Sequence, residues 1–158
     1  MAIRAKTRVS MSLSAVGQSD ARSHVRARDT EMIIDEPLDR HGSNLGLTPT
    51  ETFMASLIGC TNVISKRIAG SMGLRVGEMT VDLTAEFDRR GTMLIEEVDV
   101  PFSDIQMTIQ LETDATDDQL VHLQAELARY CPIAKMIRAT GCTITETWTR
   151  LPLRAHTE

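Results

Sequence analysis

Residues 46–61 read GLTPTETFMASLIGCT and contain both the start of a helix and a cysteine within it. Thr48 and Glu51 have the spacing of a capping box, in which each side chain bonds the other's exposed amide, and Pro49 suits the first helical position. Apolar residues then recur at helical spacing until Gly73, which can end the helix. Because the first half is apolar nearly all round, the sequence predicts a central, closely packed helix.

Strands are predicted on both sides of this helix from alternating apolar and polar residues. Upstream, residues 7–15 alternate cleanly, and residues 23–34 can return as the partner strand of a hairpin. Residues 36–47 have the Pro, Gly, Asn and Ser content of a loop. Downstream, residues 79–87 and 105–111 also alternate, and we expect them to pair antiparallel.

The last third of the chain predicts two shorter helices and a final strand. Residues 116–119 form a second capping box, and leucines at helical spacing follow it. Pro132 interrupts that helix and opens a short one over residues 133–139, while residues 142–149 read as a strand. This order of elements predicts an α+β fold with a largely antiparallel sheet, in a single domain over residues 1–158.

The composition fits a protein with one buried core. Apolar residues make up 42% of the chain, and the net charge of -5 is spread without a basic block. Aromatic residues on which bases could stack are nearly absent, so nucleic acid is not expected as a partner. No apolar run approaches the roughly 20 residues that cross a bilayer, and the start MAIRAKTRVS lacks the apolar stretch of a signal peptide. We therefore expect a cytoplasmic protein that does not associate with membranes.

The three cysteines are the candidate reactive groups. They are too few for a disulfide framework, so in a reducing compartment any bond between them should be transient and catalytic. Cys131 precedes Pro132 and is predicted to cap the short helix, where amide groups and the helix dipole would lower the thiol pKa. Cys60 taken alone reads as core packing within its helix, and Cys142 is assigned to packing as well.

Two blocks of the sequence resemble the OsmC/Ohr family. Residues 46–61 are similar to the start of that family's central helix, where a Gly-x-x-Pro-x-Glu pattern precedes the first reactive cysteine. Residues 129–135, RYCPIAK, are similar to the Cys-Pro block that carries the second. The two blocks occur in the family's order, and the chain most resembles the broader OsmC-like branch.

This resemblance implies a fold, an assembly and a reaction. The fold would be OsmC-like, with antiparallel sheets packed around a long central helix, in an intertwined homodimer whose active sites lie at the subunit interface. Cys60 would attack a small hydroperoxide and become a sulfenic acid, and Cys131 would resolve it to a disulfide that an external thiol or dithiol reduces. The pKa argument from the residues alone favours Cys131 as the nucleophile instead. No bound cofactor is expected.

The resemblance also implies an arginine that supports the thiolate, from the loop before the central helix. Arg40 is the nearest match. Weaker candidates are Arg22, Arg26 and Arg28. In the best-known peroxidase members a glutamate directly follows the helix-starting Pro and pairs with the arginine, whereas this chain has Thr50 there and Glu51 one place later. Glu51 is kept as a supporting residue, although its position about half a turn round the helix from Cys60 favours a capping role.

Two other functions stay open. One is a non-enzymatic homodimer of the same fold that binds a small apolar ligand at the subunit interface. The other is a metal site built from Cys60, Cys131 and one histidine. The candidate histidines are His24, His41, His122 and His156. Because the paired ligand spacing of structural zinc sites is missing, no metal is expected. A hydrolase is disfavoured because the sequence has no Gly-x-Ser-x-Gly elbow.

Overall fold

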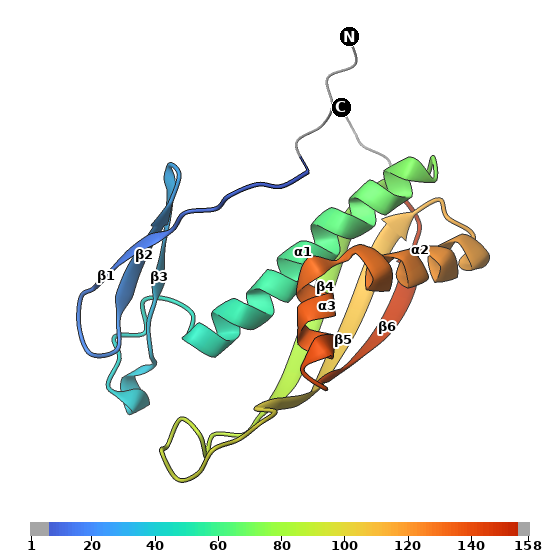
Figure 1. Cartoon of the computed structure of the whole chain (residues 1–158). Helices are drawn as coiled ribbons and strands as arrows, with labels where there is room; N and C mark the ends of the chain where they lie inside the picture. Colours follow the sequence, from blue (N-terminus) through green and yellow to red (C-terminus); the bar gives the residue numbers. More distant parts are fainter. Residues whose placement is uncertain (1–6, 155–158) are drawn as a thin grey trace. The chain divides into compact units, whose positions relative to one another are not determined.

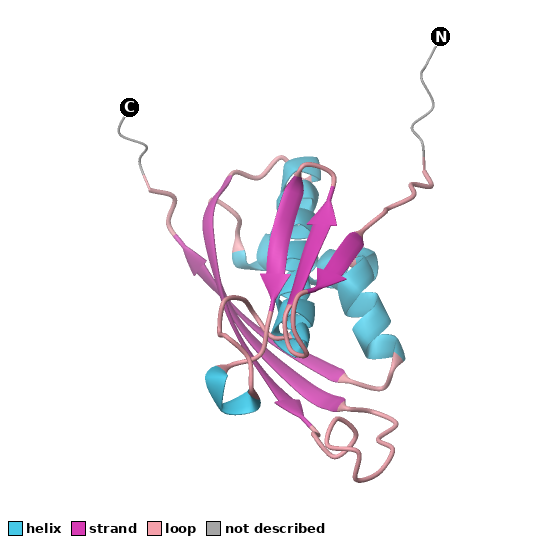
Figure 2. Ribbon diagram, turned by 90° about the vertical axis from the view of Figure 1, so that its left-hand side faces the viewer, coloured by secondary structure: helices cyan, strands magenta, loops and turns pink. Residues whose placement is uncertain are grey.

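The computed structural model describes residues 7–154, so His156 and the first residues of the chain lie outside the described part. The chain divides into two compact units, Met1–Phe53 and Met54–Glu158. The boundary falls within helix α1 (Pro49–Ser71), which belongs to both units. Each unit has its own sheet, and the three strands of each are drawn in magenta in Figure 2. That the chain acts as a single domain stays a prediction.

The sheet of the first unit is antiparallel. Its strands, in order, are β1 (Ser14–Gly17), β2 (Ser23–Ala27) and β3 (Thr30–Ile34). The prediction of a strand over residues 7–15 is wrong for residues 7–13, which precede β1 without pairing in the described part of the chain. Their apolar side chains are exposed, 84% in the case of Met11, because no neighbouring strand covers them.

The predicted partner strand over residues 23–34 is in fact the two strands β2 and β3. Arg28 adopts a left-handed backbone conformation, with φ of 54°, and forms a tight turn with Asp29. The Thr30 hydroxyl closes this turn by donating to the Ala27 carbonyl oxygen at 2.7 Å. The turn lacks the glycine or asparagine that usually signals such a conformation, which is why the alternating pattern concealed it.

The second unit contains a mixed sheet, most of α1 and the two shorter helices. Its strands, in order, are β4 (Val76–Phe87), β5 (Phe102–Thr113) and β6 (Thr143–Leu151). As predicted, β4 and β5 pair antiparallel, whereas β6 lies parallel to β5 after a crossover through α2 (Asp117–Tyr130) and α3 (Pro132–Ala139). Across both sheets three of the four strand pairings are antiparallel, so the prediction of a largely antiparallel α+β fold is confirmed.

Local signals fix the helix ends. The Thr48 amide donates to Glu51 Oε2 at 2.8 Å and the Glu51 amide donates to Thr48 Oγ1 at 3.2 Å, which confirms the first capping box. The second box is confirmed at α2, where Thr116 and Gln119 exchange the same two bonds. Gly73 ends α1 with a positive φ of 72°, a conformation that suits glycine.

The core of the second unit lies between its sheet and the helices, which cover one face of the sheet in Figure 1. Alternate residues of β5 form its centre. The fully buried ones are Ile105, Met107, Ile109 and Leu111. Leu57 of α1 and Leu123 and Leu127 of α2 pack into the same cluster. Cys131 belongs to this buried cluster, and Cys60 packs against it from α1.

Candidate active site

Cys60 and Cys131 meet within the second unit although 71 positions separate them in the sequence. Their sulfur atoms lie 3.0 Å apart, and both thiols are free. This separation is about 1 Å longer than the S–S bond of a disulfide, so a small movement of either side chain would allow a bond to form. The structure thus brings together the two cysteines that the sequence singled out.

Cys131 is held at the junction of two helices. Its amide donates to the Leu127 carbonyl at 2.9 Å, which ends α2, and its carbonyl accepts from the Lys135 amide at 3.1 Å, which begins α3. Its sulfur accepts from the Ala134 amide at 3.4 Å, so the predicted N-cap position of Cys131 is confirmed. Pro132 occupies the first turn of α3, where its missing amide costs nothing.

The predicted lowering of the Cys131 pKa is wrong. Burial raises the pKa of this thiol to about 11, because Cys131 has no exposed surface and a thiolate there would lose its hydration. The amides of Ala134 and Ile133 act in the opposite direction but are outweighed, and neighbouring Cys60 raises the pKa further. Cys131 is therefore a protonated, inaccessible thiol at neutral pH.

Cys60 differs from Cys131 in its access to solvent. It lies in the middle of α1, packs against the edge of the core and is only partly buried. Before it comes the exposed Gly59, where an added Cβ would meet no atom outside the local helix within 4 Å, and after it comes the buried Thr61. The helix is therefore open to solvent at Gly59 and closed at Thr61, with the partly buried Cys60 between them.

Arg40 and Glu51 lie in the first unit. Arg40 ends the short 3-10 helix η1 (Leu38–Arg40), and its Nη1 is 3.0 Å from Glu36 Oε2. The pKa of Glu51 is lowered by hydrogen bonds from the Thr48 amide and side chain, and to a smaller degree by the charge of Arg40. The expected capping role of Glu51 is thus observed. That Arg40 supports the Cys60 thiolate stays a prediction.

Asp35, which was not predicted from the sequence to be important, organises the loop that carries Arg40. Asp35 is fully buried, and its two carboxylate oxygens accept from the amides of Glu36 at 2.9 Å, Ser43 at 3.1 Å and Leu45 at 3.1 Å. Burial would raise the pKa of this carboxyl, but these donors outweigh it and the pKa is lowered. The only signal in the sequence was a charged residue at the end of an apolar strand.

The third cysteine takes no part in the pair. Cys142 is buried just before β6, and its sulfur lies 3.5 Å from the Thr143 carbonyl oxygen. Burial raises the pKa of its thiol, and the charge of Asp104 adds to the effect. These observations agree with the packing role expected for it.

The described residues offer neither a metal cluster nor a membrane span. Within residues 7–154 no three histidine, cysteine or acidic side chains lie close enough to hold a metal ion together. His24, one of the candidate ligands, instead has its Nε2 3.1 Å from Glu31 Oε2. Among the described helices, none is both long and apolar enough to span a bilayer.

Comparison with known proteins identifies relatives of the same fold. An OsmC-like protein from Mycoplasma pneumoniae is 12% identical and superposes with a TM-score of 0.76, over 90% of this chain and 98% of its own. An organic hydroperoxide resistance protein from Elizabethkingia anophelis is 17% identical, with a TM-score of 0.64 over 94% of this chain and 100% of its own. The corresponding protein of Bacillus subtilis is 17% identical, with a TM-score of 0.59 over 90% and 98%.

At these identities the structural matches establish the fold alone. No curated protein sequence matches the chain. The family is established by a separate comparison, in which a model of the OsmC-like protein family matches residues 41–147, a stretch that includes Cys60 and Cys131. The chain therefore belongs to the OsmC-like protein family.

Proposed function

We propose that this protein reduces hydroperoxides with Cys60 and Cys131. The observation that carries the proposal is the 3.0 Å separation of a partly exposed and a fully buried thiol. Membership of the OsmC-like family supports it, as do structural relatives that are named organic hydroperoxide resistance proteins.

The different exposure of the two thiols supports the assignment of their roles. A peroxide must reach the attacking sulfur, and Cys60 is the one of the pair with access to solvent. Cys131 is fully buried with a raised pKa, so it would react poorly with a reagent from solution. It is nevertheless placed to meet any sulfenic acid that forms on Cys60. The helix dipole alone had favoured the opposite roles, with Cys131 as the attacking thiol.

The proposed reaction has three steps. The Cys60 thiolate attacks the terminal oxygen of the hydroperoxide, an S–O bond forms and the O–O bond breaks, so that Cys60 becomes a sulfenic acid. The alkoxide that leaves takes a proton from water and departs as the alcohol. The Cys131 thiol then attacks the Cys60 sulfur, an S–S bond forms and water leaves with the hydroxyl group. An external thiol or dithiol restores both thiols by two exchange steps and is itself oxidised to a disulfide. Arg40 would favour the Cys60 thiolate.

We further infer that the protein acts as a homodimer in the cytoplasm. The unpaired apolar segment before β1 supports the dimer, because alternating exposed residues such as Met11 suit a strand added to another sheet. The cytoplasm is supported by the small number of cysteines, all of them free thiols. Sedimentation of the reduced protein tests the dimer, which a mass of one chain at micromolar concentration would exclude.

The reaction is tested by counting free thiols before and after one equivalent of cumene hydroperoxide. The wild-type protein should lose two of its three thiols, and peptide mapping should find a Cys60–Cys131 disulfide. The Cys131→Ser variant should stop at a Cys60 sulfenic acid, which dimedone traps, and the Cys60→Ser variant should keep both remaining thiols. The Cys142→Ser variant is the matched control and should form the disulfide as the wild type does.

One result of this thiol count would exclude the proposed reaction. If all three thiols survive a large excess of hydroperoxide, the protein is not a thiol peroxidase. A homodimer that binds a small apolar ligand without turnover then becomes the better account of the fold.

A further inference from the structure

The loop between β3 and α1 is a compact element of the first unit. It spans residues 36–47, and its base is closed by a hydrogen bond from the Asp35 amide to the Leu47 carbonyl oxygen at 3.0 Å. Within it His41 and Asn44 have left-handed backbones, with φ of 63° and 55°. Loops of this length whose ends meet are compact and frequently functional. The path of this loop is therefore closely defined.

The carboxylate of Asp35 fills the inside of the loop and is fully buried. Its Oδ1 accepts from the Glu36 amide at 2.9 Å, and its Oδ2 accepts from the amides of Ser43 and Leu45, each at 3.1 Å. One oxygen thus binds the start of the loop and the other binds its end. A neutral amide side chain has a single acceptor oxygen, so its NH₂ group would face a backbone donor. The loop therefore requires a carboxylate at this position.

Two further contacts fix the same loop. A side chain at Gly42 would collide with the Glu36 carbonyl oxygen, so the backbone passes there at a distance that only glycine allows. Arg22, which precedes β2, donates from its Nη1 to Ser43 Oγ at 2.9 Å. The loop is thus tied to the sheet of its own unit as well as to Asp35.

Arg40 is carried on this loop. Its Nη1 is 3.0 Å from Glu36 Oε2, and its charge contributes to the lowered pKa of Glu51 in the first turn of α1. The guanidinium therefore lies close to the start of the central helix. Because η1 (Leu38–Arg40) is only one turn long, nothing within it fixes this position, which depends on the rest of the loop.

We infer that Asp35 is a positioning residue of the proposed reaction, which holds Arg40 where its charge favours the Cys60 thiolate. The inference rests on the role proposed above for Arg40. The negative charge of Asp35 acts by itself in the opposite direction, since an anion disfavours a thiolate in its neighbourhood. Removal of the carboxylate would therefore make Cys60 more reactive by charge alone and less reactive by the loss of Arg40. The sign of the effect separates the two explanations.

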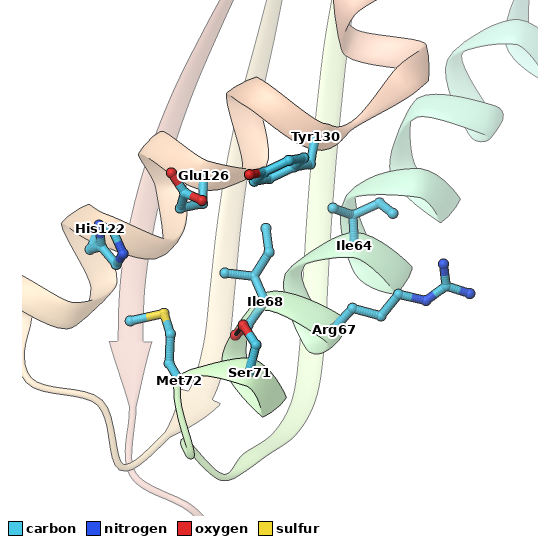
Figure 3. A pocket seen from close by; sticks show the side chains of 8 residues that line it. All are labelled: Ile64, Arg67, Ile68, Ser71, Met72, His122, Glu126 and Tyr130. Atoms are coloured by element: carbon cyan, nitrogen blue, oxygen red, sulfur yellow. Dashed lines mark hydrogen bonds between the residues drawn. The ribbon is translucent and has the colours of Figure 1, made fainter. Parts of the chain in front are cut away.

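A change at Asp35 leaves the charged groups of the second unit in place. Arg67 and Glu126 lie on α1 and α2, which face one another across the groove that Figure 3 shows. This groove is lined by side chains within residues 64–72 and 122–130. The loop contributes none of these side chains, so a lower reactivity of Cys60 in an Asp35 variant is attributed to the loop and to Arg40.

The test uses the Cys131→Ser, Cys142→Ser variant, in which Cys60 is the remaining thiol. The rate of iodoacetamide labelling at pH 7, divided by the plateau rate at high pH, gives a thiolate ratio from which the access of the reagent cancels. Asp35→Asn and Arg40→Gln should each lower this ratio about tenfold, the lower end of the effect of one adjacent charge. Combined, they should lower it no further than Arg40→Gln alone, because Asp35 acts through Arg40.

Asp39→Asn is the matched control. It removes an exposed carboxylate that directly precedes Arg40, and it should not lower the thiolate ratio. Circular dichroism shows whether each variant is folded. If Asp35→Asn does not fold, Gly42→Ala provides a second test, since its collision with the Glu36 carbonyl oxygen displaces the same loop and should produce the same fall.

Three results would overturn the inference. They are an unchanged or higher thiolate ratio in a folded variant of Asp35 or Gly42, a fall caused by Asp35→Asn that is equally large without Arg40, and an unchanged ratio in Arg40→Gln. The count of free thiols after hydroperoxide treatment keeps this test apart from the proposed reaction. If the wild type loses two thiols, the reaction stands even where the ratio overturns the role of Asp35.

Discussion

Two opposing effects act on the pKa of the buried Cys131 thiol, and their balance can be measured. The helix N-terminus lowers its pKa and burial raises it, and burial prevails, since the pKa rises from 9.0 to about 11. Each unit changes the ionised fraction tenfold, so well below pH 9 about a hundredfold fewer Cys131 thiols are ionised than for an ordinary thiol. Only the thiolate is alkylated, and Cys131 should therefore react on the order of a hundredfold more slowly.

The assay follows iodoacetamide labelling of the Cys60→Ser, Cys142→Ser double variant, in which Cys131 is the remaining thiol. The loss of Cys60 removes one minor cause of the raised pKa, but burial, the largest, remains. The labelling rate should rise about tenfold per pH unit and level off near pH 11. The Cys131→Ser, Cys142→Ser variant, which keeps Cys60, should react faster at pH 8. A rate that levels off below pH 9 would refute the reasoning, because the helix N-terminus would then outweigh burial.

Further predictions concern stability and can be measured by urea denaturation. Leu123→Ala should lower the free energy of unfolding by about 2–5 kcal/mol, because Leu123 is fully buried; Val121→Ala, on the exposed side of α2, should change it by less than about 0.5 kcal/mol. Gly77→Ala should cost about 1–3 kcal/mol, since its Cβ would lie 2.5 Å from the Oε2 of the buried Glu112. Gly59→Ala meets no atom within 4 Å and should stabilise α1 by about 0.8–1 kcal/mol, so a loss of stability there would indicate a covering surface.

The helices could be predicted from the sequence nearly to the residue because their start and stop signals are local. Thr48 with Glu51, and Thr116 with Gln119, form bonds that span three residues and need no tertiary partner. Gly73 similarly ends α1 by its own conformation. These signals have the same meaning in any fold.

The strands were predicted less well because alternation describes the faces of a segment and says nothing of its neighbours. Residues 7–13 alternate as a strand does, yet they pair with no strand in the described chain. The parallel pairing of β6 with β5 also depends on the crossover through α2 and α3, which no local pattern reveals.

The candidate site shows the same limit. The positions of Cys60 and Cys131 in their helices could be predicted, but their 3.0 Å separation spans 71 positions of sequence and depends on the packing of α1 against α2 and α3. The prediction of a lowered pKa for Cys131 failed for a related reason. A helix N-terminus is visible in the sequence, whereas the complete burial that outweighs it is a property of the folded chain.

The wide spacing of the two cysteines in the sequence has a thermodynamic consequence. A bond between Cys60 and Cys131 would close a covalent loop of some 70 residues, nearly half of the chain. A cross-link that closes a loop of this length restricts the unfolded chain. The lost chain entropy raises the free energy of unfolding by about 4 kcal/mol. The oxidised protein would then resist heat and proteases better than the reduced one, so that its lifetime would itself depend on the oxidants it meets.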